Sequence, residues 1–524
     1  MNFKYYLSAA SIVLLLGSSC KSLKENPVAS LTPGSYYQTQ NELDAAVSAI
    51  YAELTPDYSF GFTTRMTSCF GSDDLTTDPG LNKGDMRAFD ELNGASNNAS
   101  LFNQWQGPWN AEYQANAVLT YYTGVPQQSA AETQAVNQSL GQAYFLRAFS
   151  YYYLVRVFGP VPILTKVEPS SYQPPRDSVG AVYNFIVGDL QKAISLLPAD
   201  WSQVSSTPVP GRATSGAARS LLADVYLTMA GWPLNLTQNY ALAASEADSV
   251  IKSGTYALEP DFASVFTTNN GSESIFALQF NVTAGVPERS YGSTSVPLDE
   301  SGTDGSGGWD DFYPEINFYL NTPKCYRSYC TYYDTLKLLN SDKVTFTLVP
   351  WNSTATHAGH PYYKKFRHGL VTGGVADGVQ ETATSIKTIQ PSTNKAQDFI
   401  RYANVLLDFA EASDMAGGGP GSDAYNAVNL VRQRAGMPNM TPGLSQTAFR
   451  DSVVQERAWE FAGENGVRWF DIVRLQMLPQ INAARSASEP NPISTSQPIS
   501  TRYIAPIPLQ DMDNEPQWKQ NAGY

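Results

Sequence analysis

The sequence has few charged residues and few of the residue types that build metal and catalytic sites. Only 16% of its 524 residues are Asp, Glu, Lys or Arg, and it contains four cysteines and three histidines. The formal net charge is −14. Proteins bind polyanions such as nucleic acids through clustered Lys and Arg, so this charge balance argues against such a partner. An acidic, charge-poor chain with 31 Tyr and 9 Trp suits neutral, hydroxyl-rich ligands better.

Long apolar runs are absent beyond the first twenty residues, so we expect no transmembrane helix in the body of the chain. At the N-terminus, Lys4 precedes an apolar stretch at 7–16 that is too short to span a bilayer stably. Small residues then lead to Cys20. This pattern predicts a lipoprotein signal peptide over 1–19, a lipidated Cys20 and a tether over 20–40. An ordinary secretory signal followed by a chance cysteine is the alternative.

The remaining cysteines and histidines suggest two possible small sites, a disulfide and a metal site. Cys325 and Cys330 are close enough in the sequence to form a disulfide in an oxidising compartment, or they stay free thiols. His357, His360 and His368 lie close together, and the spacing of the first two would suit zinc or copper. No Cys or acidic residue stands beside them in the sequence, and basic residues surround them. We therefore expect a solvated or hydrogen-bonded loop and no metal.

The hydrophobic pattern indicates a mainly helical chain. Apolar residues recur at helical spacing over 41–54, 109–122, 134–158, 179–197, 214–230, 240–253, 397–415, 423–435 and 447–476. Gly159-Pro160 follows the block 134–158 and predicts that its helix ends there. The helical signal is lost over 71–105 and 256–396, where the Tyr and Trp content favours ordered loops over disorder. We expect these two loop-rich stretches to carry the binding site.

Small residues at packing positions predict how the helices pair. Several neighbouring blocks are separated by short turns, and alanines allow two helices to approach closely. These alanines are Ala217, Ala218 and Ala223, and then Ala403, Ala410 and Ala412. Such packing is typical of tetratricopeptide repeats, although the 34-residue consensus is not strictly kept. A generic helical bundle is the alternative.

Charged residues within the helical blocks are expected to be structural. Arg147 and Arg156 lie in an otherwise aromatic block, while Arg468, Asp471 and Arg474 share one helix face. This arrangement favours charge pairing between packed helices over contact with a ligand.

Short strings in a fixed order resemble one protein family. They are Asn26-Pro27 with Leu31-Thr32-Pro33, ANAV at 115–118, GQAYFLRAFSYYYLVRVFGPVP at 141–162, GRAT at 211–214 followed by LLADVYL, RYA at 401–403 followed by LLDFAEA, VRQRAG at 431–436, RWFDIVR at 468–474, and a C-terminal APIP…QNAGY. In this order, from Cys20 to Tyr524, the chain resembles the SusD/RagB family of outer-membrane lipoproteins of Bacteroidetes-type bacteria. One departure is ENGVR at 464–468, where the family often has Glu-Gly-His-Arg-Trp.

The resemblance implies both a fold and a function. It implies a single SusD-like domain over 41–524, with a tetratricopeptide-repeat-like scaffold at about 41–255 and 397–480, loop-rich insertions and few short strands. Relatives of this type bind oligosaccharides, or peptides in some cases, and cap a SusC-like TonB-dependent transporter during nutrient uptake. The resemblance therefore implies a lipid-anchored, surface-exposed outer-membrane protein that needs no cofactor. Peptide binding stays the alternative to glycan binding.

The loop-rich stretches contain the chemistry that a sugar requires. A pyranose offers an apolar face to flat aromatic rings and a rim of hydroxyls to short carboxylates or amides. We predict that Trp309, Tyr313 and Trp105 form the aromatic surface on which the sugar stacks. Asp310 or Asp73 would bind its hydroxyls. The further candidates are Tyr291, Phe102, Asn103 and Arg87. Two or three stacked rings with a few hydrogen bonds predict a dissociation constant of roughly millimolar to tens of micromolar. Each aromatic residue could instead simply anchor its own loop.

An extracellular glycoside hydrolase is the remote alternative. It needs two opposed carboxylates about 5 to 9 Å apart. Asp73-Asp74 and Asp310-Asp311 are adjacent pairs, whose side chains point apart on an extended chain. No catalytic motif surrounds them, and the sequence lacks a nucleophile-elbow string. The sequence therefore predicts binding without catalysis.

Overall fold

The computed structural model describes residues 33–62, 71–78, 80–169, 172–201, 211–281, 283–289, 297–300, 309–342, 345–367, 371–372, 375–376, 394–489 and 498–524. The predicted signal peptide and the residues Cys20, Cys69, Tyr291 and His368 lie outside these ranges. Within them, no helix combines the length and apolar character needed to span a membrane. The predicted mainly helical fold with few short strands is confirmed.

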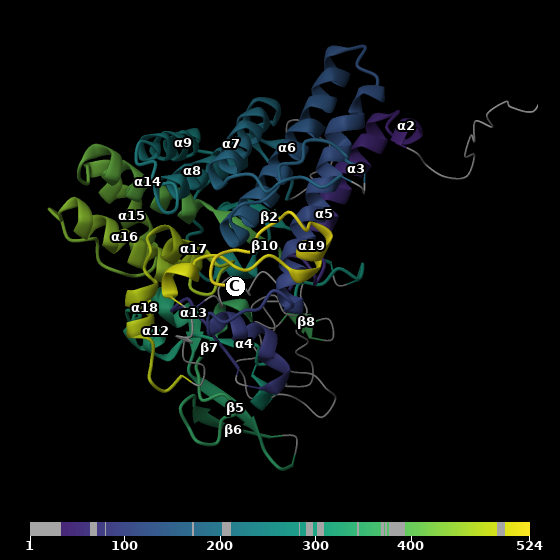
Figure 1. Cartoon of the computed structure of the whole chain (residues 1–524). Coiled ribbons are helices and arrows are strands. Elements are labelled where there is room, and N and C mark those ends of the chain that lie inside the picture. The colour runs from purple at the N-terminus through teal and green to yellow at the C-terminus, as the bar shows by residue number, and fades with distance from the viewer. Residues whose placement is uncertain are drawn as a thin grey trace, which may run out of the picture.

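A row of packed helices forms the scaffold. They are α3 (Gln40–Glu53), α5 (Ala99–Tyr121), α6 (Ala130–Phe158), α7 (Val179–Leu196), α8 (Ser215–Ala230), α9 (Asn239–Ser253), α14 (Tyr402–Gly417), α15 (Ser422–Arg434) and α16 (Gln446–Glu460). Each of α5 to α8 packs against the next, α9 packs against α14, and α14 packs against α15 and α16. Figure 1 shows this row across the upper part of the molecule. The six alanines predicted at packing positions are all fully buried, in agreement with a tetratricopeptide-repeat-like scaffold.

Helix α6 is the centre of this scaffold. Ser129 and Glu132 form a capping box at its N-terminus. From Val136 onwards most of its side chains are buried, as expected for a helix that is apolar on all sides. It ends before Gly159, whose φ of +72° favours glycine. The predicted end of this helix is confirmed.

Short elements make up the loop-rich part and the C-terminal end. The helices are α2 (Pro33–Tyr36), α4 (Gly84–Asp90), α10 (Ser264–Thr267), α12 (Ile316–Asn321), α13 (Tyr326–Thr331), α17 (Val467–Arg474), α18 (Leu478–Ala484) and α19 (Leu509–Asn514), with a 3₁₀ turn η6 (Lys364–Phe366). The strands form antiparallel pairs: β1 (Thr76–Thr77) with β3 (Phe312–Tyr313), β2 (Ser274–Leu278) with β10 (Gln397–Arg401), β4 (Tyr332–Tyr333) with β7 (Tyr362–Tyr363), β5 (Thr335–Leu339) with β6 (Phe346–Pro350), and β8 (Val371–Thr372) with β9 (Val375–Ala376). The β5–β6 hairpin lies at the end of the molecule opposite the helical row (Figure 1).

The first loop-rich stretch is more helical than predicted. Helix α5 begins at Ala99, where the Asn98 side chain caps it by accepting a hydrogen bond from the Leu101 amide, rather than at residue 109. The helix continues through Gly107-Pro108. Gly107 is required because a Cβ atom there would lie 2.3 Å from the Ser59 hydroxyl oxygen. Phe102, Asn103 and Trp105 are therefore helical residues.

Two other predicted helices have different bounds. The block 397–415 begins with strand β10, and its helix α14 starts at Tyr402. The block 447–476 is interrupted between α16 and α17, where Gly463 and Gly466 have φ values of +73° and +72°. A Cβ atom on Gly463 would lie 2.8 Å from the ring of Tyr363. The prediction of one long helix is wrong because this turn packs against a residue far away in the sequence.

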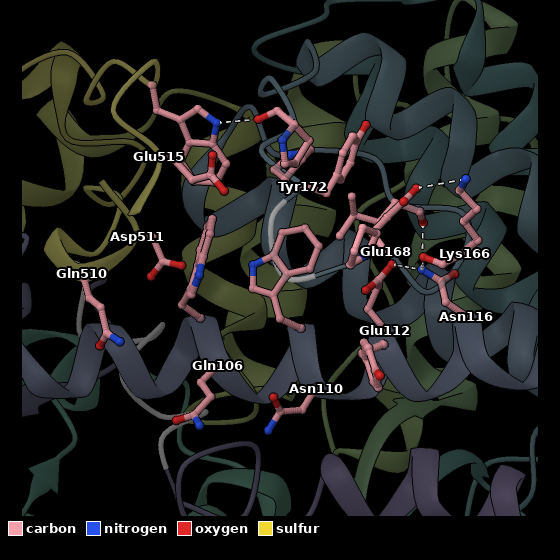
Figure 2. Close-up of a pocket in the computed structure, with 18 of the residues that line it drawn as sticks. Gln106, Asn110, Glu112, Asn116, Lys166, Glu168, Tyr172, Gln510, Asp511 and Glu515 are labelled. Atoms are coloured by element: carbon pink, nitrogen blue, oxygen red, sulfur yellow. Dashed lines mark hydrogen bonds and ion pairs between the residues drawn. The ribbon is translucent and has the colours of Figure 1, made fainter. Parts of the chain in front are cut away.

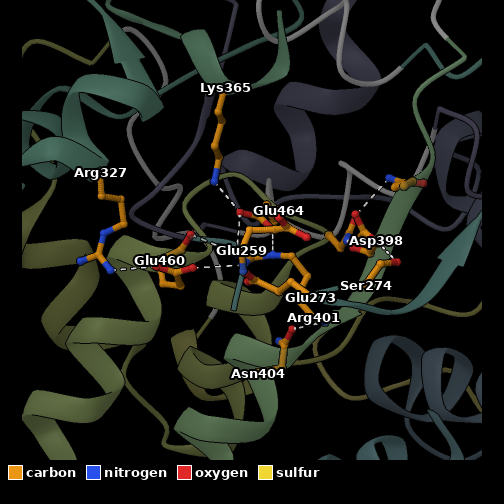
Figure 3. Close-up of polar contacts among 12 residues, drawn as sticks. Glu259, Glu273, Ser274, Arg327, Lys365, Asp398, Arg401, Asn404, Glu460 and Glu464 are labelled. Carbon is orange, nitrogen blue, oxygen red and sulfur yellow. Dashed lines mark hydrogen bonds and ion pairs between the residues drawn. The ribbon is translucent and has the colours of Figure 1, made fainter. Parts of the chain in front are cut away.

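A buried ionic network joins the loop-rich part to the scaffold (Figure 3). Arg401 Nε donates to Glu464 at 3.0 Å, and Lys365 Nζ donates to the same carboxylate at 2.5 Å. Arg327, on α13, donates to Glu460 at 2.9 Å. The side chains of all five residues are at most 5% exposed. Breaking one partner of such a network leaves a buried charge uncompensated, so these contacts fix how the two parts pack.

The predicted structural role of the scaffold arginines is confirmed. Arg147, on α6, donates through two nitrogens to Asp189, on α7, at 2.7 and 2.9 Å. Arg474, on α17, makes a similar two-point contact with Glu411, on α14. Arg156 lies 3.7 Å from the ring centroid of Phe470. These side chains bridge packed helices.

Cys325 and Cys330 do not form the possible disulfide, and both are free thiols in the structure. Cys325 caps the N-terminus of α13 and Cys330 lies near its C-terminus. Cys325 precedes the first helical residue and has an extended backbone, so the two thiols are not placed by the helix alone.

Candidate ligand-binding pocket

A cavity of about 380 Å³ lies between α5, the segments 162–169 and 172–174, and the C-terminal segment 510–518. Its lining includes six aromatic residues, which are Phe102, Trp105, Trp109, Tyr113, Tyr172 and Trp518. We call it the tryptophan pocket. Tyr113 and Tyr172 are 51% and 45% exposed, so the pocket opens to solvent between two accessible rings. Figure 2 shows it above α5, with Glu112 and Asp511 on either side of the central rings.

Helix α5 supplies the floor of the pocket. Trp105 and Trp109 are four residues apart and so share one helix face. Their ring centroids are 5.5 Å apart with an interplanar angle of 62°. Trp105 also packs edge-on against Phe158, with centroids 4.8 Å apart, which fixes it on the scaffold. The two indole rings therefore form a rigid corner.

The C-terminal segment supplies the facing wall. The Trp518 ring lies 6.3 Å from that of Trp105 at 72°, and its Nε1 donates to the Pro174 carbonyl oxygen at 2.8 Å. Arg176 Nη2 donates to the Asn521 side chain at 2.6 Å. The tail is thus held against the segment that follows α6. Trp105 thus meets both Trp109 and Trp518 edge to face and stacks on neither ring.

Glu112 is a buried carboxyl group in the lining of the pocket. Its side chain is 2% exposed, and its Oε1 accepts hydrogen bonds from Asn116 Nδ2 and the Tyr151 hydroxyl. Burial raises the pKa of Glu112 to about 8, although the nearby Arg147 guanidinium acts in the opposite direction. At neutral pH the Glu112 carboxyl group is therefore largely protonated.

Two further polar atoms in the lining have unused hydrogen-bonding capacity. Trp109 Nε1 and Asp511 Oδ2 are buried and have no hydrogen-bond partner within the described residues. Burial also raises the pKa of Asp511, with a hydrogen bond from Trp105 acting against it. Buried polar atoms in folded proteins are nearly always paired. One donor and one acceptor are thus available to a ligand inside an aromatic cavity.

Only two of the predicted site residues, Trp105 and Phe102, line this pocket. Asn103 is on α5 but outside the lining. Arg87, on α4, donates to the Gly80 carbonyl oxygen at 3.2 Å. These residues do not gather around one ligand position.

Asp73 was predicted as a polar grip, and the structure gives it a different contact. Both of its carboxylate oxygens accept hydrogen bonds from the guanidinium of Arg468, at 2.6 and 2.8 Å. Arg468 is 2% exposed. The carboxylate is therefore engaged in an internal ion pair.

The residues around Trp309 are mostly buried. Trp309 itself is 37% exposed and meets Phe62 edge-on, with centroids 5.8 Å apart. Asp310 is fully buried, and its Oδ1 accepts a hydrogen bond from the Tyr362 hydroxyl at 2.9 Å. Tyr313 is also fully buried. Trp309, Tyr313 and Trp105 therefore belong to separate groups of rings, and of the three only Trp309 presents a substantially exposed face.

The histidine cluster is tied into the same buried region. His360 stacks on the Tyr313 ring with centroids 4.8 Å apart, and its Nε2 lies 3.1 Å from Glu489. His357 is half-exposed, and its Nε2 lies 3.7 Å from Asp78. Folding thus brings acidic residues that are distant in the sequence beside these histidines. Among the described residues, no group of three or more His, Cys, Asp or Glu side chains is arranged to hold a metal ion.

Sequence analysis missed most of the pocket. The four-residue spacing of Trp105 and Trp109 was a usable signal, since it places both rings on one helix face. Tyr172 and Trp518 had no local signal, because only the long-range contact between the C-terminal tail and the segment after α6 brings them to α5.

Comparisons with known proteins agree with this architecture. A family model described as "SusD family" matches residues 253–524, and one described as "Starch-binding associating with outer membrane" matches residues 71–227. SusD-like protein P2 of Formosa agariphila is 26% identical over 547 residues, which cover 99% of this chain and 100% of that protein.

Solved structures give the same result. A SusD homolog from Bacteroides thetaiotaomicron is 21% identical with a TM-score of 0.79, covering 94% of this chain and 98% of that one. Surface glycan-binding protein A from Bacteroides thetaiotaomicron in complex with laminarihexaose is 21% identical with a TM-score of 0.70, covering 92% of this chain and 99% of that one. At this level of identity the similarity shows a common fold.

Proposed function

This chain belongs to the SusD/RagB family, and we propose that it is a surface glycan-binding protein that captures oligosaccharides in the tryptophan pocket. The observation that carries the proposal is the corner of three indoles, Trp105, Trp109 and Trp518, with polar groups beside them. The solved relative that holds laminarihexaose supports a glycan as the class of ligand.

The pocket has the two features that sugar recognition requires. Flat rings accept the apolar face of a pyranose, and Trp109 Nε1 and Asp511 Oδ2 supply an unpaired donor and acceptor for its hydroxyls. Each stacked ring contributes about 0.5–1.5 kcal/mol. Two or three rings with a few hydrogen bonds then correspond to roughly millimolar to tens of micromolar dissociation constants. Capture of this strength permits rapid release.

We further propose that the protein acts at the outer membrane as the partner of a transporter. The pattern ending at Cys20 supports a lipid anchor, and the family model that names the outer membrane supports the location. The resemblance to SusD-type proteins supports delivery of the ligand to a SusC-like TonB-dependent barrel. Since the transporter supplies the energy of import, the binding protein needs no cofactor and no catalytic group.

The test is calorimetric titration of the purified protein with a panel of neutral oligosaccharides, followed by the same titration of Trp109→Ala. We expect binding of at least one glycan without turnover, and a loss of about 2- to 12-fold in affinity when one stacked ring is removed. Trp459→Ala, on α16 and outside the pocket, is the matched control and should bind normally. Hydrolysis of a glycan would favour the hydrolase, and binding of peptides alone would favour the peptide-binding alternative.

A further inference from the structure

The charged groups of the tryptophan pocket have mostly one sign. Its described lining includes the carboxyl groups of Glu168, Asp511 and Glu515 and a single basic residue, Lys166, while the raised pKa of Glu112 leaves that carboxyl group largely neutral. Lys166 Nζ lies 3.7 Å from Glu168, so its charge is already partly balanced (Figure 2). The charge left in the pocket is therefore negative. Such a site disfavours sulfated or uronic-acid sugars, because their anionic groups would meet carboxylates inside a partly desolvated cavity.

The aromatic walls favour a positive charge for an independent reason. The face of an indole ring carries negative potential and attracts a cation within about 6 Å of its centroid. Here the indole planes of Trp105 and Trp109 meet at 62°, and those of Trp105 and Trp518 at 72°. Both pairs are in edge-to-face contact and Trp105 is only 4% exposed, so the half-buried Trp109 and Trp518 supply the indole surface that a cation in the cavity can reach.

We propose that the tryptophan pocket binds a protonated amine, and that its ligand is an oligosaccharide containing an amino sugar with a free amino group. This inference rests on the proposed glycan-binding function of the same site and specifies its substrate class. The ammonium group lies in the cavity beside Trp109 and Trp518, and the rest of the sugar packs along the exposed rings of Tyr172 and Tyr113.

The carboxyl groups complete the recognition of the amine. An ammonium group has three N–H donors. Asp511 Oδ2 is a buried acceptor without a partner in the described part of the chain, and Glu515 lies on the same tail segment. Glu112, on the other side of the cavity, is largely protonated and adds a polar group without a charge (Figure 2). A neutral N-acetylated sugar would satisfy the rings but would leave the carboxyl groups of Asp511 and Glu515 without a charged partner.

The test compares two ligands that differ only in the substituent on the sugar nitrogens, which is a free amine in one and an acetamide in the other. The purified full-length protein is titrated calorimetrically with the glucosamine tetramer and with the fully N-acetylated tetramer, at a mildly acidic pH of about 6, where a sugar amine is protonated. We expect the free-amine tetramer to bind about tenfold more tightly. Raising the salt concentration should weaken only the free-amine tetramer, since only it makes a charged contact.

The net negative charge of the protein also attracts a cationic ligand. Matched variants distinguish this overall attraction from the contribution of the pocket carboxylates. The double variant Asp511→Asn with Glu515→Gln removes two carboxylates from the pocket. Asp513→Asn removes one exposed carboxylate from the same helix α19 outside the lining. We expect the ratio of the two affinities to fall to about 2 or less in the double variant and to stay near the wild-type ratio in Asp513→Asn.

Equal affinities for the two tetramers, or an unchanged ratio in the double variant, would overturn the inference about the amine. Loss of neutral-glycan binding in Trp109→Ala would still support the proposed function, so the two ideas fail separately. Binding of a lysine-rich peptide without binding of either tetramer would overturn the amino-sugar assignment.

Discussion

Arg468 Nε and Nη2 donate to the two carboxylate oxygens of Asp73 at 2.6 and 2.8 Å, which joins the first loop-rich stretch to helix α17. Arg468 is 2% exposed, and the Asp73 side chain is 15% exposed. The sequence predicts that Asp73 binds the ligand through its carboxylate and that Arg468 has a structural role in the scaffold. Their ion pair shows that this part of the loop belongs to the frame of the molecule.

Asp73→Asn should therefore destabilise the fold more than it affects ligand binding. Removing the carboxylate leaves the Arg468 guanidinium buried without its counter-charge, at a cost on the order of 3 kcal/mol of unfolding free energy. Urea unfolding measures this loss, and calorimetry should give an unchanged glycan affinity. The control is Asp57→Asn, because the Asp57–Arg289 pair is exposed and should contribute under about 1 kcal/mol. A large loss of affinity with normal stability would instead make Asp73 a ligand-binding residue.

The buried network around Arg401 should be among the most sensitive parts of the protein. Arg401→Met leaves the carboxylates of Glu273, Glu460 and Glu464 without this partner and should cost about 3–5 kcal/mol. The comparison is Arg219→Met, which breaks a partly exposed pair with Glu246 and should cost less than about 1 kcal/mol. Equal midpoints of urea unfolding for the two variants would contradict this view of the network.

Glu112 should make stability depend on pH. Its pKa is about 8 in the folded protein against an ordinary value of 4.5, so the folded state holds a proton that the unfolded state has lost between these two values. The stability linked to this proton is complete below about pH 4.5 and is lost as the pH rises to about 8.

Glu112→Gln removes this titration and keeps an oxygen for Asn116 and Tyr151. Between about pH 5 and 8 the wild type should lose stability relative to Glu112→Gln by up to about 1.4 kcal/mol per pH unit. Denaturant titrations at several pH values measure the difference. Parallel stability curves for the two proteins would show that Glu112 is ionised in the folded state.

Trp309 stays a predicted ligand contact. Its ring is 37% exposed, so Trp309→Ala should leave the fold intact. If the ring stacks on a sugar, the variant should bind long oligosaccharides about 2- to 10-fold more weakly. Identical titrations for Trp309→Ala and the wild type, across short and long glycans, would remove Trp309 from the binding surface.

Local signals made most of the scaffold predictable. Helix α6 has an aromatic second half, from Tyr144 onwards, and is followed by Gly159-Pro160, so its end at Phe158 was predicted correctly. The turn between α16 and α17 depends on the close approach of Gly463 to Tyr363, which no local pattern records. Helix α5 begins at Ala99, ten residues before the predicted block 109–122, and continues through Gly107-Pro108.

The candidate site was harder to predict because it depends on contacts between distant segments. Aromatic and acidic residues of the loop-rich part looked like sugar-binding groups, yet Tyr313 donates from its hydroxyl to Asp78 and is buried. Trp518 lies at the other end of the chain from Trp105, and the two meet only in the folded protein. Composition predicts aromatic rings and carboxylates at the site, and the tryptophan pocket contains both, but composition alone does not locate such a site.

The central claim is that the tryptophan pocket holds the glycan, and the affinity of Trp109→Ala tests it most directly. Calorimetric titration of this variant with the tightest-binding oligosaccharide should show a loss of about 2- to 12-fold, with the Trp459→Ala control unchanged. Wild-type affinity in a correctly folded Trp109→Ala protein would contradict the claim and place the binding site elsewhere.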